Sequence, residues 1–452
     1  MDSSNQKVEQ KEEKVCKKKR RLRSDFGEII FIIFSIIFIL GCCFFFGRRF
    51  IKYYRIYNPK SENGEQVKLL ANSISESSSI VSEGDGLYQL SGSYIYKGEK
   101  VNNYLKFSGF MFRIMKINSD GSVRIILDEP INSLFYDKKN TDYIKSDINA
   151  YLNDVFLNKL DVSKLAKSST CLDKVTNLNS VTCNNVNTDY YVSLPNVTDF
   201  LNSKQENSYM KNSSGESFWL SSYNNIEAWT SNGSNLSSSK VSNTYAVKPI
   251  LTLKNSNILY RGTGTKEDPY VISNEKDNLE IASYVKLGDD LYIIYDKCED
   301  TLSLTLASLY KDGNTKYRFA LKQKIYDPSD DNSLAKYLNT TFLNSLSYKD
   351  IILDSKWYIG EYTNSYKDIY NKDITAKVGT LNIADLKFGN LNAPYYLLNA
   401  SSDSDKVYIY GNSSITLSKI TLSRAFRPAI KIKSSNIKSG TGSYDDPYKV
   451  VK

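Results

Sequence analysis

The segment YLNDVFLNKL at residues 151–160 of this 452-residue chain returns as YLNTTFLNSL at residues 337–346. A second segment, GTGTKEDPY at residues 262–270, returns as GTGSYDDPY at residues 440–448. In both pairs the second copy follows the first at nearly the same offset along the chain. A period of about 180 residues has the size of a whole domain and exceeds that of a solenoid repeat. The chain is therefore predicted to contain a tandem duplication.

The duplication extends over most of the chain beyond residue 83. Lys248 and Arg427 each precede a proline in strand-like segments, at nearly the same offset and in the same order as the longer matches. Ordered matches at a nearly constant offset indicate two copies of one domain. We place the first repeat at residues 84–273 and the second repeat at residues 281–452.

Each repeat is expected to begin with a β-hairpin. Residues 111–117 and 122–127 are rich in β-branched and apolar side chains, and the turn between them contains Asn118 and Gly121, which tolerate positive φ. The second repeat has similar runs at residues 291–296 and 302–306.

A helix is expected to follow each hairpin. Apolar residues between 148 and 156 recur at helical spacing, with Ser146 as a candidate N-cap, and the same stripe returns at residues 334–342. A second, shorter helix is expected near residues 195–201 and again near 382–386. The predicted class is α+β, with mainly antiparallel strands and one or two helices per domain.

The N-terminal region has a different composition. Residues 29–46 contain no charged residue, and a helix of that length approaches the thickness of a bilayer core. Residues 1–28 are strongly basic and are expected to remain in the cytoplasm, which would place the later residues outside the cell. Residues 47–83 are predicted to form a juxtamembrane segment and a flexible stalk. We expect a single-pass cell-membrane protein with the lipid bilayer as partner of residues 29–46.

Two other interpretations of this region stay open. Cys42, in the sequence ILGC, resembles the lipidated cysteine of a bacterial lipobox, although the apolar run continues past it. A cleaved signal peptide would need a cleavage site of small residues, and no such site follows Phe46, where Gly47 is followed by two arginines.

Charge and composition exclude several functions. Residues 1–57 hold 13 Lys/Arg and six Asp/Glu, whereas the remainder holds 46 and 44, so the basic charge lies near the N-terminus. A nucleic-acid-binding domain would carry its cations on the binding surface, so no nucleic-acid partner is expected. The chain has no His, which excludes Ser-His-Asp and Cys-His nucleophile pairs and His-ligated zinc.

Residues 86–126 resemble an uncharacterised domain common in surface proteins of low-GC Gram-positive bacteria. The resemblance rests on Asn102-Asn103-Tyr104, Phe112-Arg113-Ile114, Asp120-Gly121-Ser122, Cys171 with Cys183, Phe218-Trp219 and Val247-Lys248-Pro249. Phe112 replaces the usual Trp of the pattern, and Lys248 replaces its usual Arg. The second repeat matches mainly in its helix and near Phe426. The resemblance implies a surface location and no established activity. Phe112-Arg113 near the start of the first repeat and Phe426-Arg427-Pro428 near the end of the second suggest a more distant similarity to the C-type-lectin-like fold.

Cys171 and Cys183 are candidates for a disulfide. They lie close together in a polar stretch that the topology places outside the cytoplasm, where disulfides persist. Two free thiols are the alternative. Cys298 has no neighbouring cysteine in the sequence and is interpreted as structural or incidental.

Aromatic and amide side chains mark one candidate ligand surface. Trp219, Tyr223 and Trp229 flank an Asn/Ser-rich loop, and such residues combine rigid contact area with adaptable hydrogen bonds. Codon bias in an AT-rich genome is an alternative explanation of the same composition. Lys248 and Arg427 are candidate anion contacts, although a packed structural cation is the favoured interpretation.

These observations favour a membrane-anchored cell-surface protein that acts through binding or as a structural element, with an extracellular glycan or protein as its partner. The alternative is a cell-surface hydrolase that cleaves glycans with paired carboxylates. No motif selects a catalytic pair. The acidic runs at residues 327–331 and 403–405 do not match an EF-hand loop, so neither a metal nor a cofactor is expected.

Overall fold

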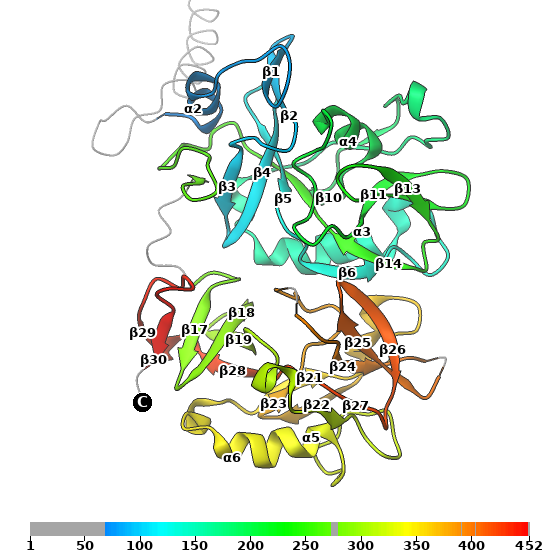
Figure 1. The fold of residues 1–452 in the computed structure, drawn as a ribbon, viewed down its shortest axis with the longest axis vertical. Coiled ribbons are helices and arrows are strands. Elements are labelled where there is room, and N and C mark those ends of the chain that lie inside the picture. Colours follow the sequence, from blue (N-terminus) through cyan, green and yellow to red (C-terminus); the bar gives the residue numbers. More distant parts are fainter. Residues whose placement is uncertain (1–67, 273–278, 390, 403, 451–452) are drawn as a thin grey trace, which may run out of the picture. The chain divides into compact units, whose positions relative to one another are not determined.

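The computed structural model describes residues 68–272, 279–389, 391–402 and 404–450 (Figure 1). The first repeat contains a nine-stranded sheet with the central order β1-β2-β4-β5-β15-β10, a five-stranded sheet with the order β13-β12-β11-β14-β6, and a two-stranded sheet, β8-β9. The strands are β1 (Gly86–Leu90), β2 (Ser93–Lys97), β3 (Tyr104–Phe107), β4 (Phe110–Ile117), β5 (Val123–Leu127), β6 (Asn132–Phe135), β7 (Leu165–Ala166), β8 (Thr170–Cys171), β9 (Val186–Asn187), β10 (Val192–Ser193), β11 (Phe218–Tyr223), β12 (Ala228–Ser231), β13 (Leu236–Ser239), β14 (Thr244–Val247), β15 (Ile250–Leu253) and β16 (Tyr270–Val271).

The second repeat contains a seven-stranded sheet with the order β23-β28-β19-β18-β17-β30-β29, a three-stranded sheet, β24-β25-β26, and two two-stranded sheets. The strands are β17 (Tyr284–Leu287), β18 (Asp290–Cys298), β19 (Thr301–Leu306), β20 (Tyr317–Arg318), β21 (Ser355–Tyr358), β22 (Asp373–Ala376), β23 (Val378–Gly379), β24 (Tyr395–Ala400), β25 (Lys406–Gly411), β26 (Ser414–Lys419), β27 (Ser423–Arg424), β28 (Ala429–Lys433), β29 (Ile437–Ser439) and β30 (Tyr448–Val450). The α-helices are short: α2 (Leu70–Ser77), which precedes the first repeat, and α3 (Asp147–Tyr151), α4 (Val197–Ser203), α5 (Leu334–Tyr337) and α6 (Leu343–Ser345).

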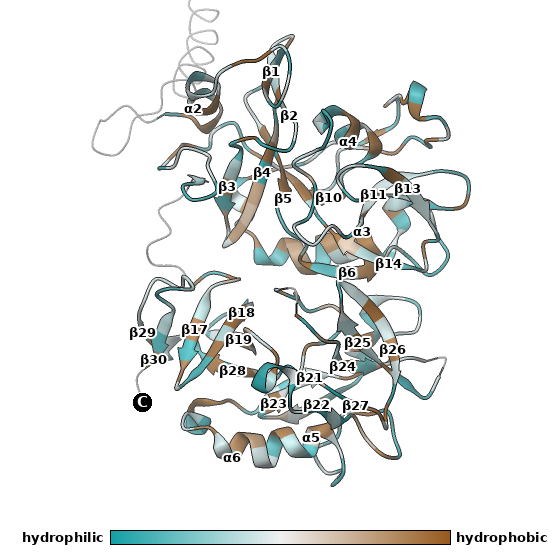
Figure 2. Ribbon diagram, in the orientation of Figure 1, coloured by the Kyte–Doolittle hydropathy of each residue, from teal (hydrophilic) through white to brown (hydrophobic). Residues whose placement is uncertain are grey.

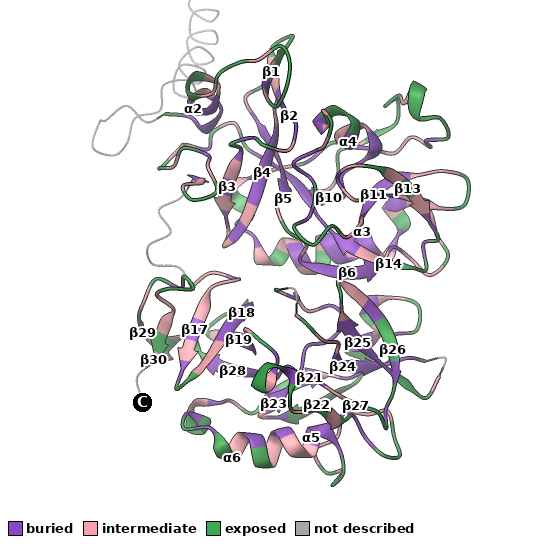
Figure 3. Cartoon of the chain, in the orientation of Figure 1, coloured by how far each residue is buried: buried purple, intermediate pink, exposed green. Residues whose placement is uncertain are grey.

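The predicted hairpins are present in both repeats. β4 pairs with β5, and Gly121 adopts φ +80° in the turn between them. Every residue of β5 is buried, and these two strands are among the most apolar and most buried of the molecule (Figures 2 and 3). β18 pairs with β19 in the same way, and both hairpins shift register once, between Ile114 and Lys116 and between Ile294 and Asp296.

The helices predicted at residues 148–156 and 334–342 are present but less regular than expected. Ser146 caps α3 by accepting a hydrogen bond from Asn149 N, but the helix then continues as a π-helical turn over Leu152–Phe156. The second repeat shows the same change after α5, where a π-helical turn covers Leu338–Phe342.

A repeated asparagine links this helical segment to the edge of the large sheet. Asn153 donates to the carbonyl oxygen of Val192 at 3.0 Å and accepts from its backbone nitrogen at 3.4 Å. Asn339 makes the same two bonds with Val378, at 2.9 and 3.0 Å. Because Val192 and Val378 belong to edge strands, the asparagine occupies the place of a further strand. This role explains why the motif Tyr-Leu-Asn occurs in both repeats.

The repeated Gly-Thr-Gly motif closes each domain. Gly264 O accepts a hydrogen bond from Tyr104 N at 2.9 Å, and Gly442 O accepts one from Tyr284 N at 2.8 Å. The motif then leads into β16, which pairs parallel to β3, or into β30, which pairs parallel to β17. Gly262 has φ +101°, and a Cβ there would lie 1.9 Å from Pro269 O, so glycine is required.

The structure corrects the predicted fold class. The regular secondary structure is mainly β-strand with a few short α-helices, and each long helical stripe forms a short α-helix that continues as a π-helical turn. The predicted transmembrane helix at residues 29–46 falls outside the described residues. Within the described ranges, no helix has the length and apolar character needed to cross a membrane.

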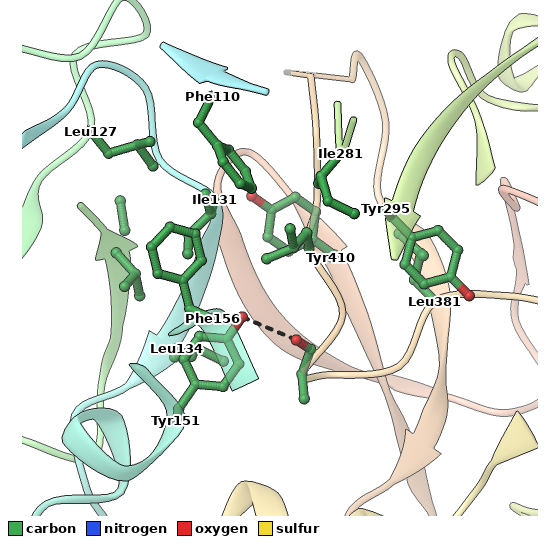
Figure 4. Packing of buried hydrophobic residues seen from close by; sticks show 14 of the residues in the cluster. Phe110, Leu127, Ile131, Leu134, Tyr151, Phe156, Ile281, Tyr295, Leu381 and Tyr410 are labelled. Carbon is green, nitrogen blue, oxygen red and sulfur yellow. Dashed lines mark hydrogen bonds between the residues drawn. The ribbon is translucent and has the colours of Figure 1, made fainter. Parts of the chain in front are cut away.

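The two repeats share a buried apolar contact, which Figure 4 shows from close by. The Tyr151 hydroxyl donates to Ala384 O at 3.0 Å, and the rings of Phe110 and Phe388 lie 6.4 Å apart. Phe135 stacks on Tyr362 with a centroid distance of 5.2 Å. Burial of aromatic surface of this kind contributes strongly to stability.

A lysine is buried within the same contact. The Nζ atom of Lys387 is surrounded by four oxygen acceptors: Asn132 Oδ1 at 3.1 Å, Asn382 O at 3.0 Å, Ile383 O at 2.8 Å and Asp385 O at 2.8 Å. Burial lowers the pKa of Lys387, and the neighbouring carboxylate of Asp385 opposes that shift. The four oxygens compensate the cost of burying the amine.

Candidate functional site

A large open cleft lies in the second repeat. It has a volume of about 880 Å³ and is lined by residues of β17 and β18, the segment after β19, the segment after α6, and the loop before β30. The polar and aromatic lining residues are Tyr284, Asp289, Asp290, Ser308, Tyr310, Lys311, Asp312, Ser345, Ser347, Tyr348 and Tyr444.

Two tyrosines form one side of the cleft. The rings of Tyr284 and Tyr444 meet edge to face with centroids 5.3 Å apart. Tyr444 is 67% exposed, so most of its ring is available to a ligand. The backbone of Tyr284 is fixed by the glycine motif, because its nitrogen donates to Gly442 O at 2.8 Å. The repeated glycine motif therefore brings two residues that are far apart in the sequence into contact.

A hydrogen-bonded chain forms another side. The Tyr348 hydroxyl donates to Asp290 Oδ2 at 2.5 Å and receives a hydrogen bond from the Tyr292 hydroxyl at 2.9 Å. Burial, reinforced by Tyr292 and Asp290, raises the pKa of Tyr348 well above its ordinary value. The hydroxyl therefore remains a proton donor to Asp290 and fixes the orientation of that carboxylate.

The segment Tyr310–Gly313 carries backbone strain. Lys311 and Asp312 adopt φ values of 47° and 54°, in the left-handed region that residues with a Cβ rarely occupy. Both residues line the cleft, and Lys311 is exposed there. The ring of Tyr310 stacks on Phe426 with centroids 5.2 Å apart, which anchors the strained segment. Strain of this kind costs about 1 to 3 kcal/mol per residue and is concentrated at binding sites.

The cleft carries more negative than positive charge. Asp289, Asp290 and Asp312 line it, together with the single cation Lys311. Among the residues that the structure describes, no cluster of three acidic or cysteine side chains could hold a metal ion. The arrangement offers carboxylate acceptors, hydroxyl groups and tyrosine faces.

The first repeat lacks an equivalent surface. Lys266 occupies the position of Tyr444 in the repeated glycine motif. Tyr104 occupies the position of Tyr284, but the guanidinium of Arg113 covers its ring at 3.8 Å from the centroid. In the second repeat the residue paired with Tyr284 on the neighbouring strand is Ile293, whereas in the first repeat the residue paired with Tyr104 is Arg113. The aromatic cleft is therefore a difference between the two repeats.

The predicted ligand surface in the first repeat needs correction. Trp219 is fully buried and donates through Nε1 to Leu134 O at 2.9 Å, so it reaches no ligand. Trp229 is half-buried and donates to Val175 O at 3.1 Å, and Tyr223 is also half-buried. Phe218, Trp219 and Leu220 are all fully buried, so both faces of β11 pack into the core.

The two candidate anion contacts are packed cations. Lys248 is fully buried and donates to Met210 O at 2.7 Å. Arg427 is also fully buried and donates to Leu306 O at 2.6 Å and Phe388 O at 3.0 Å. Both bind backbone carbonyl groups of neighbouring segments, so neither presents an exposed charge to an anion.

Cys171 and Cys183 form a disulfide with their Cα atoms 5.5 Å apart, and Cys298 is exposed with a free thiol. Of the acidic residues considered for calcium, Asp327 accepts from Ser329 in an exposed turn, and Asp403 lies outside the described residues. No family model, curated protein or solved structure matches this chain.

Proposed function

We propose that the second repeat binds an extended neutral glycan in its aromatic cleft. The observation that carries this proposal is the convergence of Tyr284, Tyr310 and Tyr444 with three aspartates in one open cleft. The faces of a sugar ring present C–H groups, which pack on tyrosine, and its edges present hydroxyl groups, which donate to carboxylates. The cleft offers a partner for each kind of group.

The charge of the cleft restricts the glycan class. Three aspartates and one lysine give a negative potential, which repels carboxylated or sulfated polysaccharides. Neutral hexoses and N-acetylhexosamines avoid this repulsion. The cleft volume of about 880 Å³ favours an oligosaccharide over a single sugar.

Binding is the activity that the observations support first. Asp290 is already engaged by the Tyr348 hydroxyl, which favours a fixed acceptor for sugar hydroxyls. Hydrolysis is the second candidate, because Asp289 and Asp312 also line the cleft and glycosidases use pairs of carboxylates. Release of new reducing ends that is lost in an Asp312→Asn variant would favour hydrolysis.

We propose in addition that the two repeats function outside the cytoplasm. The disulfide between Cys171 and Cys183 supports this location, because such bonds persist in oxidising compartments. Alkylation of intact cells followed by mass spectrometry tests it. Cys171 and Cys183 should resist alkylation until a reductant is added; free thiols at both positions would contradict this location.

The binding proposal is tested by titrating the full-length protein with a panel of neutral oligosaccharides of hexoses and N-acetylhexosamines. The most informative variant is Tyr444→Lys, because it installs the residue that the first repeat carries. Tyr260→Ala is a matched control, since Tyr260 is 52% exposed and does not line the cleft.

A further inference from the structure

A second pocket lies in the first repeat, separate from the aromatic cleft. It has a volume of about 210 Å³ and is lined by residues of β2, β4, β5 and α4. Cys171 and Cys183 line it as well, so the disulfide forms part of its wall. Most of its other lining residues are polar, and Lys116, Arg124 and Asp199 are the charged ones.

Two cations face this pocket from adjacent strands. Lys116 on β4 is directly opposite Arg124 on β5 in the strand register. Like charges in this position repel one another and destabilise a sheet. Arg124 forms an ion pair with Asp199 at 3.0 Å, whereas Lys116 makes no ion pair with any described residue. The pocket therefore holds one positive charge more than its single carboxylate neutralises.

Arg124 also has an unused donor. Its side chain is 9% exposed, and its terminal nitrogens donate to Ser169 O at 2.8 Å and Asp199 Oδ2 at 3.0 Å. Its Nε atom is buried and has no hydrogen-bond partner within the part of the chain that the structure describes. A buried donor without an acceptor costs about 1 to 3 kcal/mol, which an added acceptor would recover.

The second repeat shows that the fold does not need this cation pair. Asp296 and Ser303 follow the corresponding register shift and oppose each other where Lys116 and Arg124 do in the first repeat. Asp296 forms an ion pair with Lys159. The same hairpin therefore forms with an acidic and a neutral residue at these two positions, so the cations serve something other than the hairpin itself.

We infer that this pocket binds a small monocarboxylate that carries an ammonium or hydroxyl group beside its carboxylate. The carboxylate would accept hydrogen bonds from Lys116 and from Arg124 Nε. It would thereby neutralise the charge of Lys116 and give Arg124 Nε the acceptor that it lacks. The neighbouring donor group would reach Asp199, whose Oδ2 atom already accepts from Arg124 and from Asn196 N. Asp199 disfavours a dianion such as phosphate, because a second negative charge would lie beside its carboxylate.

Two sources share this chemistry: an amino acid or peptide C-terminus, and a sugar acid. Alanine and glucuronate are suitable probes for them, and acetate lacks the additional donor. Calorimetric titration of the full-length protein is expected to show saturable binding of alanine or glucuronate, with acetate binding more weakly. Whichever probe binds identifies the source.

The variants locate the site. Lys116→Gln and Arg124→Lys are expected to weaken binding of that probe at least tenfold, and Arg124→Lys keeps the positive charge beside Asp199 while it removes the Nε donor. Lys240→Gln, at an exposed lysine outside the pocket, is the control. Tyr444→Lys should leave this binding unchanged, which separates it from the aromatic cleft. Absence of saturable binding by both probes, wild-type affinity in Lys116→Gln, or acetate binding as tight as theirs would overturn the inference.

Discussion

The Nζ atom of Lys387 lies 3.1 Å from Oδ1 of Asn132, a residue 255 positions earlier in the chain. Asn132 returns two hydrogen bonds across the same contact, to Ile383 O at 3.0 Å and Asp385 O at 3.2 Å. Both side chains are almost fully buried. The polar centre of the contact between the repeats is thus fully hydrogen-bonded, which is the condition for burying such groups.

Replacement of Lys387 tests the importance of this centre. Lys387→Met keeps the length of the side chain and removes one hydrogen bond from each of four buried oxygens, so it should lower the free energy of unfolding by about 3 kcal/mol. Lys438→Met, at an exposed lysine, should change it by less than about 0.5 kcal/mol. Urea denaturation compares the two. Equal stability of both variants would show that the buried amine does not stabilise the contact.

Lys248 should make stability depend on pH in the alkaline range. Burial lowers the pKa of Lys248 from 10.5 to about 8, so between these values the unfolded chain binds more protons than the folded chain. The free energy of unfolding should therefore rise with pH across this window. Relative to Lys248→Met, which cannot titrate, the wild type should gain about 2 kcal/mol from pH 8 to pH 10. Parallel pH profiles of the two proteins would contradict this assignment.

The disulfide should stabilise the first repeat. Cys171 and Cys183 are 12 positions apart, and closing a loop of that size contributes about 3 kcal/mol in the chain-entropy model. The double variant Cys171→Ser/Cys183→Ser should lose that amount and should also bind the small carboxylate more weakly, because both residues line its pocket. Cys298→Ser is the control, since its thiol is free and exposed. A double variant as stable as this control would contradict the prediction.

The duplication and the hairpins could be predicted because their signals are local or repeated. Gly121 and the apolar runs beside it define a turn and two strands within one short segment. The repeated Asn153 and Asn339 marked an important position, but their bonds to edge strands much later in the chain could not be predicted from spacing. The change to a π-helical turn after α3 and after α5 could not be predicted from the spacing either.

The aromatic cleft could not be predicted, because its tyrosines are distributed along the second repeat from Tyr284 to Tyr444 and meet only through sheet pairing. The sequence favoured Trp219, whose indole is a core side chain because both faces of β11 are buried. One signal was present: Tyr444 replaces Lys266 within an otherwise matching motif. A difference between two copies of a domain can mark a site that one copy alone possesses.

The most direct test of the account is the affinity of wild type and Tyr444→Lys for the same neutral oligosaccharide, measured by calorimetry with Tyr260→Ala as control. Loss of an exposed aromatic contact at a binding site costs about 1.4 kcal/mol or more, which is a tenfold change in affinity. The account predicts saturable binding that weakens at least tenfold in Tyr444→Lys and is unchanged in Tyr260→Ala. Failure of the wild type to bind any neutral oligosaccharide of the panel, or equal affinity of all three proteins, would contradict it.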